Sequence, residues 1–340
     1  MPRTPLPVIV ALILGAVALT AYPAFADTYS VRLMSKVMVL AIFAMSLDLL
    51  VGYAGLVSLG HAAFFGVGAY VTAALIAKAG ISEIMVIVPA SLAASALAAL
   101  VIGWFSIRTS GIYFLMITLA FAQMLYFFFH DMPFWWGGDG VNLSRAQLPK
   151  LSLGDTTLLD LSDRMVLYYT VLGSLVACYV LLVVLLRAPF GRVLLGIRVN
   201  ENRVRALGYD VQRYKLVAFV IAGTLAGFAG FLEAARTGFV APAHLSWHES
   251  GFVLIIVLLG GMGTLFGPIL GAFVLVLLED WVAGLTDRWL LVMGMFVISM
   301  VLFLPNGIAG LLAKVGQLRR TPRKPTPEAN GSVTEAAADG

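Results

Sequence analysis

The stretch "VLYYTVLGSLVACYVLLVVLL", residues 166–186, decides the class of fold, because none of its 21 side chains is charged. A helix needs roughly 20 apolar residues to cross a bilayer. The composition extends this argument to the whole chain, which is 61% hydrophobic and 12% charged over 340 residues. Soluble proteins usually carry about twice that charged fraction. The sequence therefore predicts an all-α, polytopic bundle of transmembrane helices.

About ten spans are expected, some of them short or broken. They are residues 8–26, 33–51, 57–77, 84–105, 111–130, 166–186, 215–238, 250–261, 265–279 and 288–304. The first has two interpretations, a retained helix or a secretory signal peptide with Arg3 before its apolar core and a small-residue site at 24–26. Both interpretations leave the sidedness of the later spans unchanged.

The distribution of basic residues predicts how the chain is oriented. Residues 187–215 carry seven basic and two acidic side chains, a net charge of +5, whereas residues 131–165 carry three basic and five acidic side chains, a net charge of −2. Basic loops stay on the cytoplasmic side. We therefore expect 187–215 inside and 131–165 outside. Four basic residues between 319 and 324 predict a cytoplasmic tail, and both termini are expected inside.

A glycine-rich stretch divides the region 250–279. A single long helix would leave the basic tail outside, whereas two short passes interrupted at "LLGGMGTLFGP" (258–268) return it to the cytoplasm. Irregular backbone at membrane depth is tolerated where protein or a water-filled cavity covers it. The interruption is either a plain helical hairpin or the lining of a pathway. In the second case Gly260, Gly261 and Gly263 are candidate pathway residues.

A second glycine-rich stretch, "GYAGLVSLGHAAFFGVGAYV" (52–71), interrupts an apolar region near the N-terminus. Transporters place pairs of glycine-interrupted segments at their binding or translocation region. The two stretches share only their glycine spacing, so the match is weak support for an internal repeat. The candidate pathway residues here are Gly52, Gly55, Ser58, Gly60 and His61.

Few ionisable side chains fall inside the predicted spans, where burying a charge costs several kcal/mol. Asp48 is either a packing group that accepts a hydrogen bond or a functional group. Glu233 and Arg236, three residues apart, can pair on one helical face. This pair is either a local structural ion pair or part of a translocation lining, which makes Glu233 a further pathway candidate.

Several kinds of chemistry are absent from the sequence. No Gly-x-x-x-x-Gly-Lys-Ser/Thr loop occurs, so the chain has no phosphate cradle of the Walker type. No catalytic set and no zinc or other metal-ligand pattern is present either. We therefore expect no enzyme activity, no catalytic residues, no metal and no cofactor bound by this chain. Nothing in the sequence points to nucleic acid, and the expected surroundings are the lipid bilayer.

The polar segment "RVNENRVRALGYDV", residues 198–211, lies between two apolar spans. Glu201 and Arg205 stand four residues apart and can pair along a short helix, which Gly208 would end as a C′ glycine. Such a helix on the cytoplasmic side can dock against a soluble partner. The alternative is an ordinary basic loop whose charge only sets the orientation.

Four ordered motifs resemble the branched-chain amino acid permeases of ABC importers, specifically the second of their two membrane subunits. They are "LLVGYAGLVSLGHAAFFGVGAYV" (49–71), "SGIYFLMITLAFAQM" (110–124), "PFGRVLLGIRVNENRVRALGYDVQRYKLVAFVIAGTLAGFAGFLEAARTGFVAP" (189–242) and "LLGGMGTLFGPILGAF" (258–273). The likeness covers roughly residues 33–310. It implies a multi-pass protein of the bacterial inner membrane that works with a second homologous permease, with cytoplasmic ATPases that bind the ATP, and with a periplasmic substrate-binding protein.

The resemblance also implies roles for segments of this chain. The permease domain would be residues 33–313, with a coupling loop at 187–215. The apolar segment 1–32 before it is expected in the membrane, and the composition of 314–340 predicts a disordered cytoplasmic tail. The residues expected to contact the ATPase are Arg198, Glu201, Asn202, Arg205, Ala206, Leu207 and Gly208. The family signature of this loop is Glu-x-Ala-Ala-x-x-x-Gly, and "NRVR" replaces its small pair here, which leaves the contacting residues open.

The family carries leucine, isoleucine and valine, but relatives also carry other amino acids, urea, amides and aromatic acids, and nothing in the sequence chooses among these solutes. Two other classes of protein remain as alternatives. A secondary transporter driven by an ion gradient would use Asp48 and Glu233 as coupling acids. An integral membrane enzyme is the least supported class, because no nucleophile, base and metal set converges.

Overall fold

The computed structural model describes residues 6–144, 147–153, 156–304 and 307–311, and it is mostly helical. The helices at the ten predicted spans are α1 (Leu6–Ala21), α2 (Thr28–Asp48), α3 (His61–Ala77), α4 (Ile84–Ser106), α5 (Ile112–Asp131), α6 (Arg164–Arg187), α9 (Val211–Thr237), α10 (Trp247–Gly260), α11 (Gly267–Ala283) and α12 (Trp289–Phe303). Six of the described helices are long and apolar enough to cross a membrane. The predicted all-α bundle with several spans is confirmed. The predicted tail, 314–340, lies outside the described residues.

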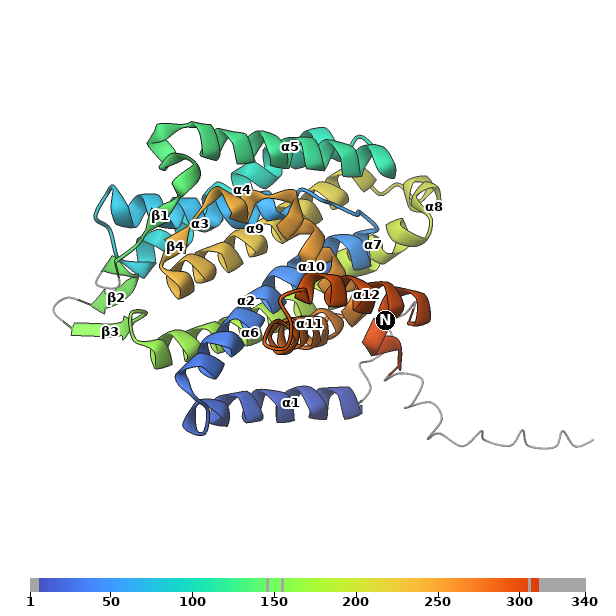
Figure 1. Cartoon of the computed structure of the whole chain (residues 1–340). Coiled ribbons are helices and arrows are strands. Elements are labelled where there is room, and N and C mark those ends of the chain that lie inside the picture. Colours follow the sequence, from blue (N-terminus) through green and yellow to red (C-terminus); the bar gives the residue numbers. More distant parts are fainter. Residues whose placement is uncertain (1–5, 145–146, 154–155, 305–306, 312–340) are drawn as a thin grey trace, which may run out of the picture.

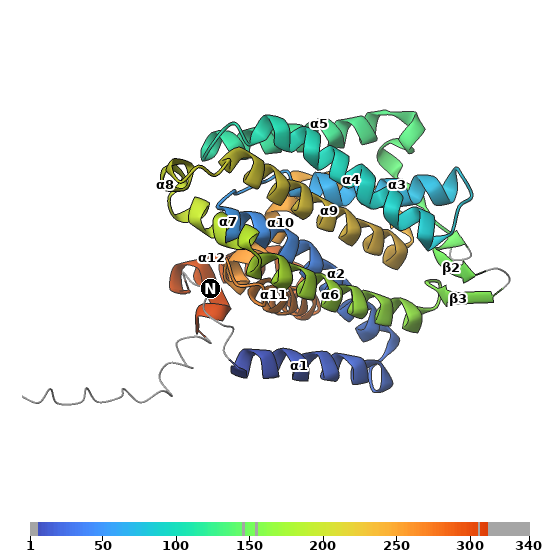
Figure 2. The same ribbon diagram turned by 180° about the vertical axis from the view of Figure 1, so that it is seen from behind.

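The helices lie side by side, and the polar connections gather at the two ends of the bundle (Figure 1, Figure 2). Two short helices, α7 (Pro189–Val199) and α8 (Glu201–Ala206), connect α6 to α9, and α8 lies at one end. A hairpin of strands β2 (Lys150–Leu153) and β3 (Thr156–Asp160) lies at the opposite end. The loops expected on opposite sides of the membrane are thus at opposite ends of the bundle.

Two more strands lie at the end of the bundle that carries the hairpin. Strand β1 (Val141–Asn142) pairs antiparallel with β4 (Phe239–Val240), which directly follows α9. In the neighbouring hairpin, Lys150 Nζ lies 3.2 Å from Asp160 Oδ2, and the backbone N–H of Ser162 donates to Asp160 Oδ1 at 2.9 Å. The Ser162 hydroxyl, which also donates to this carboxylate, and the charge of Lys150 hold the pKa of Asp160 below its usual range.

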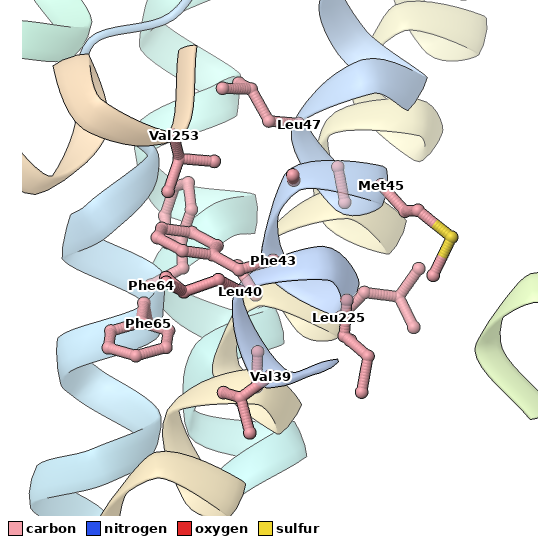
Figure 3. Packing of buried hydrophobic residues seen from close by; sticks show 14 of the residues in the cluster. Val39, Leu40, Phe43, Met45, Leu47, Phe64, Phe65, Leu225 and Val253 are labelled. Carbon is pink, nitrogen blue, oxygen red and sulfur yellow. The ribbon is translucent and has the colours of Figure 1, made fainter. Parts of the chain in front are cut away.

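Helix α2 is the centre of the packing, because every residue from 37 to 54 is buried. Figure 3 shows Phe43 and Leu40 of α2 beside Phe64 and Phe65 of α3, with Leu225 of α9 and Val253 of α10 around the same helix. From residue 37 onward α2 therefore has protein on all its faces and does not contact lipid. The apolar character of α2 therefore serves packing against its neighbours as well as entry into the bilayer.

Glycines allow α3 and α9 to approach closely. A β-carbon at Gly68 of α3 would overlap the carbonyl of Gly227 on α9, and one at Gly230 would overlap the carbonyl of Phe65. Small residues let the backbones of membrane helices touch in this way. The predicted interruption at 52–71 is therefore too wide. Gly66 and Gly68 belong to a regular helix in which they serve close packing.

Candidate functional site

The first break in the helical bundle is the connection between α2 and α3, residues 55–60. Helix α2 does not end near residue 51 as predicted, because it continues as a π-helical turn, Leu49–Ala54 (labelled η2). The turn ends at Gly55, whose φ of 73° is in the left-handed region that favours glycine. π-Helical turns are rare and frequently mark functional sites.

The first break runs back into the bundle before α3 begins. His61, the first residue of α3, is hydrogen-bonded through Nε2 to Oγ of Ser46, at 2.8 Å. Ser46 lies eight residues before the end of the π-helical turn at Ala54, which corresponds to about 12 Å of helix. Helix α3 therefore starts inside the bundle, and the side chains of Ser58 and His61 are completely buried there.

The second break, residues 261–266, separates α10 from α11. Region 250–279 is thus two helices joined by a short irregular segment, as the sequence predicts. The hydroxyl of Thr264 donates to the carbonyl of Gly261 at 2.7 Å. Gly260 is packed so closely against Gly267 that a β-carbon there would overlap the Gly267 carbonyl. Gly307 lies against Gly261 in the same way, so the chain after α12 returns to this break.

The two breaks are in direct contact. The backbone N–H of Gly263 donates to Asp48 Oδ1 at 2.8 Å, and Asp48 is completely buried. A β-carbon at Gly52 would overlap both that oxygen and the backbone nitrogen of Gly263. Two glycine-rich stretches about 210 residues apart in the sequence therefore form one site, although their sequences share little besides glycine.

Helix α7 contributes a basic side chain to this contact. Arg198 donates a hydrogen bond to the carbonyl of Gly52 in the π-helical turn. Its side chain also lies against Gly55, where its Cγ would be 3.3 Å from a β-carbon, and against Gly263. One residue expected in the ATPase-coupling set is thus joined to three of the pathway candidates.

The rest of the polar segment forms α8, whose start and end have specific caps. The side chain of Asn200 accepts a hydrogen bond from the backbone N–H of Arg203 at 3.0 Å, which caps the N-terminus. Glu201 and Arg205 pair at 2.9 Å, as their spacing predicts. Gly208 follows the helix with a φ of 87°. These contacts favour one conformation of the segment.

The tip of α8 projects away from the bundle. Leu207 is 71% exposed, and the residues Asn202, Arg205, Ala206 and Gly208 are exposed as well. Val204 is buried and anchors the helix. An exposed leucine among basic side chains at the end of the bundle is suited to contact with a soluble protein surface.

Glu233 lies apart from the two breaks, near the far end of α9. Arg236 donates to both of its carboxylate oxygens, at 2.8 and 2.5 Å, and both side chains are largely buried. Lys36 and Glu279 form a second ion pair, at 3.5 Å, and the charge of Lys36 also acts on Glu233. The structure does not bring Glu233 together with the other pathway candidates.

Two residues that the sequence did not single out, Asn200 and Lys215, help to build the site. Asn200 immediately precedes the short helix, and asparagine is a common N-cap residue, so this signal was present. Lys215 gave no such signal, and Asp48 was a candidate without an indicated partner, because both contacts join separate elements of the structure. Lys215 Nζ donates to Glu201 Oε2 at 2.7 Å, and Asp48 accepts from a residue 215 positions away.

Comparison with known proteins is consistent with this architecture. The profile of the family described as "Branched-chain amino acid transport system / permease component" matches residues 29–304. The high-affinity branched-chain amino acid transport system permease protein LivM of Escherichia coli is 33% identical over an alignment of 321 positions, which covers 88% of this chain and 74% of that protein. No solved structure is significantly similar to the chain.

More distant relatives match over shorter segments. The autoinducer 2 import system permease protein LsrC of Klebsiella pneumoniae is 38% identical over 125 positions, 32% of this chain and 36% of that protein. The xylose transport system permease protein XylH of Escherichia coli is 31% identical over 99 positions, 28% of this chain and 25% of that protein. These similarities are to transport permeases whose names refer to different solutes.

Proposed function

The chain belongs to the family of permease components of branched-chain amino acid transport systems, and from this membership we propose that it is the membrane subunit of an ATP-driven importer. In this proposal it pairs with a second, homologous permease. Cytoplasmic ATPases bind the ATP, and a periplasmic binding protein delivers leucine, isoleucine, valine or related small solutes. The permease is multi-pass, and we place both of its termini and α8 on the cytoplasmic side of the inner membrane.

One observation supports the coupling role most directly. The polar segment is a capped helix with an exposed tip, fixed to the bundle by Arg198 at its start and by Glu201, which pairs with Lys215 of α9. An ordinary basic loop does not need such fixation. A helix that is exposed on one side and held on the other can transmit the movement of a soluble partner to the membrane helices.

We propose branched-chain amino acids as the solutes because of the share of this chain that each relative matches. The relative whose name refers to these amino acids covers 88% of this chain, whereas the two relatives named for autoinducer 2 and xylose cover 32% and 28%. Calorimetry of the isolated binding protein with leucine, isoleucine and valine tests this choice. Binding of a sugar in place of these amino acids would contradict it.

The coupling role is tested by copurification. Gly208→Leu places a side chain on a residue with a φ of 87° at the tip of α8, and we expect it to weaken recovery of the ATPase with the permease. Gly80→Leu is the matched control, since Gly80 has a φ of 66° and equally open surroundings. Its loop lies at the hairpin end of the bundle, where the Ser82 carbonyl accepts from the Lys150 N–H. Equal recovery of the ATPase with both variants would contradict docking at α8.

The energy source is tested separately. Removal of the Walker lysine of the ATPase should abolish uptake by the intact system. Uptake that persists in this variant but collapses with an uncoupler would identify an ion-driven secondary transporter instead.

A further inference from the structure

Arg198 contacts both breaks from α7, the helix that leads into α8. It is the penultimate residue of α7, and its guanidinium donates to the Gly52 carbonyl. The same guanidinium lies against Gly263, with Nη1 2.9 Å from the point where a β-carbon would be. Any displacement of α7 must therefore move, stretch or release this contact.

Asp48 provides the second half of the arrangement. Its Oδ1 accepts the Gly263 N–H, and its Oδ2 has no hydrogen-bond partner among the described residues. The side chain is completely buried, and Arg198 is the cation whose charge acts on it. A buried carboxylate oxygen without a partner is costly, so Oδ2 is a ready acceptor for a donor that moves toward it.

We propose that Arg198 and Asp48 form a latch that holds the two breaks together and releases them when the ATPase displaces α7 and α8. In the state described here, Arg198 occupies the Gly52 carbonyl and Asp48 holds Gly263. On displacement of α7, the guanidinium leaves Gly52 and reaches Asp48 Oδ2, which weakens the hold of this carboxylate on Gly263. The two breaks then separate and the bundle opens near the α8 end.

This proposal rests on the proposed function, and it makes Arg198 a positioning residue rather than a residue that contacts the solute. The proposal predicts that replacement of Arg198 uncouples ATP hydrolysis from uptake. Without the guanidinium, the ATPases can still dock on α8 and hydrolyse ATP, but their movement no longer reaches the breaks. A residue needed only for folding would instead lower assembly, ATP hydrolysis and uptake together.

The experiment uses the complete transporter in proteoliposomes with its binding protein and a transported amino acid. In the structure the Arg198 guanidinium faces the breaks, and the exposed residues of α8 and its tip remain for docking of the ATPase. For Arg198→Ala we therefore expect normal recovery of the ATPase and continued ATP hydrolysis, with uptake per ATP reduced by about tenfold or more, within the usual range of coupling between sites. Arg198→Lys should have an intermediate effect, since an ammonium can reach one acceptor but lacks the fork of the guanidinium. Arg192→Ala, at an exposed position on the same helix, is the control and should match the wild type.

A second readout reports the breaks directly. Val57 of the first break is 39% exposed, and Cys178, the single cysteine of the chain, is buried and can be replaced by alanine. In this background we expect the labelling of Val57→Cys by a thiol reagent to depend on nucleotide, and to lose this dependence with Arg198→Ala or with Asp48→Asn. If Arg198→Ala fails to assemble, the labelling of Val57→Cys in the Asp48→Asn variant still tests the latch.

Wild-type uptake per ATP in Arg198→Ala, or an equal loss in Arg192→Ala, would overturn the latch. So would nucleotide-dependent labelling that survives in both Arg198→Ala and Asp48→Asn. Failure of the proposed function looks different, because wild-type uptake would then not require ATP hydrolysis at all.

Discussion

Lys215 of α9 donates to Glu201 of α8 across 2.7 Å, and the two side chains differ sharply in exposure, 7% for Lys215 and 35% for Glu201. Glu201 has a second partner in Arg205, whereas Lys215 has only Glu201 among the ion pairs of the described residues. The buried lysine therefore depends on the glutamate more than the glutamate depends on the lysine.

Removal of Glu201 should consequently destabilise the permease more than removal of Lys215. Glu201→Gln leaves a buried ammonium without its counter-charge, for which a cost of about 3 kcal/mol is typical. Lys215→Met leaves a glutamate that still pairs with Arg205. Thermal unfolding of the purified permease should show this order, with partial recovery in the double variant. Arg213→Ala, which removes an exposed pair with Asp210, is the control, and the reverse order would show that the ion pair does not hold α8.

The Glu233–Arg236 pair is expected to stabilise the folded permease. Glu233→Gln leaves a largely buried guanidinium unpaired, and we expect a loss of about 3 kcal/mol of unfolding free energy. The double variant Glu233→Gln with Arg236→Met should recover much of this loss, and uptake should follow the amount of folded permease. Loss of uptake in Glu233→Gln at unchanged stability would instead favour a place for Glu233 in the translocation lining.

The close approach of α3 and α9 gives a prediction with a matched control. Gly68→Ala places a methyl group on the Gly227 carbonyl, whereas Gly173→Ala on α6 meets nothing within 4 Å. We expect Gly68→Ala to lower the thermal stability markedly, because the two helices must move apart. Gly173→Ala should be neutral, or stabilising by up to about 1 kcal/mol from helix propensity. Equal effects at the two positions would show that the helices do not touch as described.

The β2–β3 hairpin should weaken in acid. The folded protein holds the pKa of Asp160 below its ordinary value, through Ser162 and Lys150. Its contribution to stability is therefore complete above the ordinary value of about 3.9, and it is lost as the pH falls through the lower folded value. Pepsin cleavage within 150–160 should rise as the pH is lowered. The ratio of cleavage in Asp160→Asn to that in the wild type should be highest about 1 unit above the ordinary carboxyl pKa and should approach one in stronger acid.

Much of the bundle follows from local sequence signals. The ten apolar stretches locate ten helices, and Gly208 correctly ends α8, because hydropathy and capping depend on neighbouring residues. The ends of α2 and α3 were less accurate. A π-helical turn keeps α2 helical to Ala54, and the chain then runs backward before His61. Neither feature changes the average hydropathy of the region, so the span positions alone could not reveal them.

The contacts that build the candidate site are of another kind. Asp48 and Gly263 are 215 residues apart, and Arg198 and Gly52 are 146 apart. A helical period relates residues three or four positions apart, so it carries no information on such pairs. Most of these residues could be named as candidates from the sequence, because charges are rare inside spans and clustered glycines interrupt the two apolar regions. Their mutual contact required the tertiary structure.

The central place of α2 has a consequence for biosynthesis. A ribosome completes α2 well before α9, α10 and α11, yet these helices enclose it in the finished protein. The segment must therefore insert into the bilayer because it is apolar itself, and it remains surrounded by lipid until the later helices have been inserted. Asp48 and Lys36 meet Gly263 and Glu279 only after more than 200 further residues have been made. During that interval the long side chain of Lys36 can extend toward the lipid headgroups, whereas Asp48 has not yet met the Gly263 N–H that it accepts from in the finished protein.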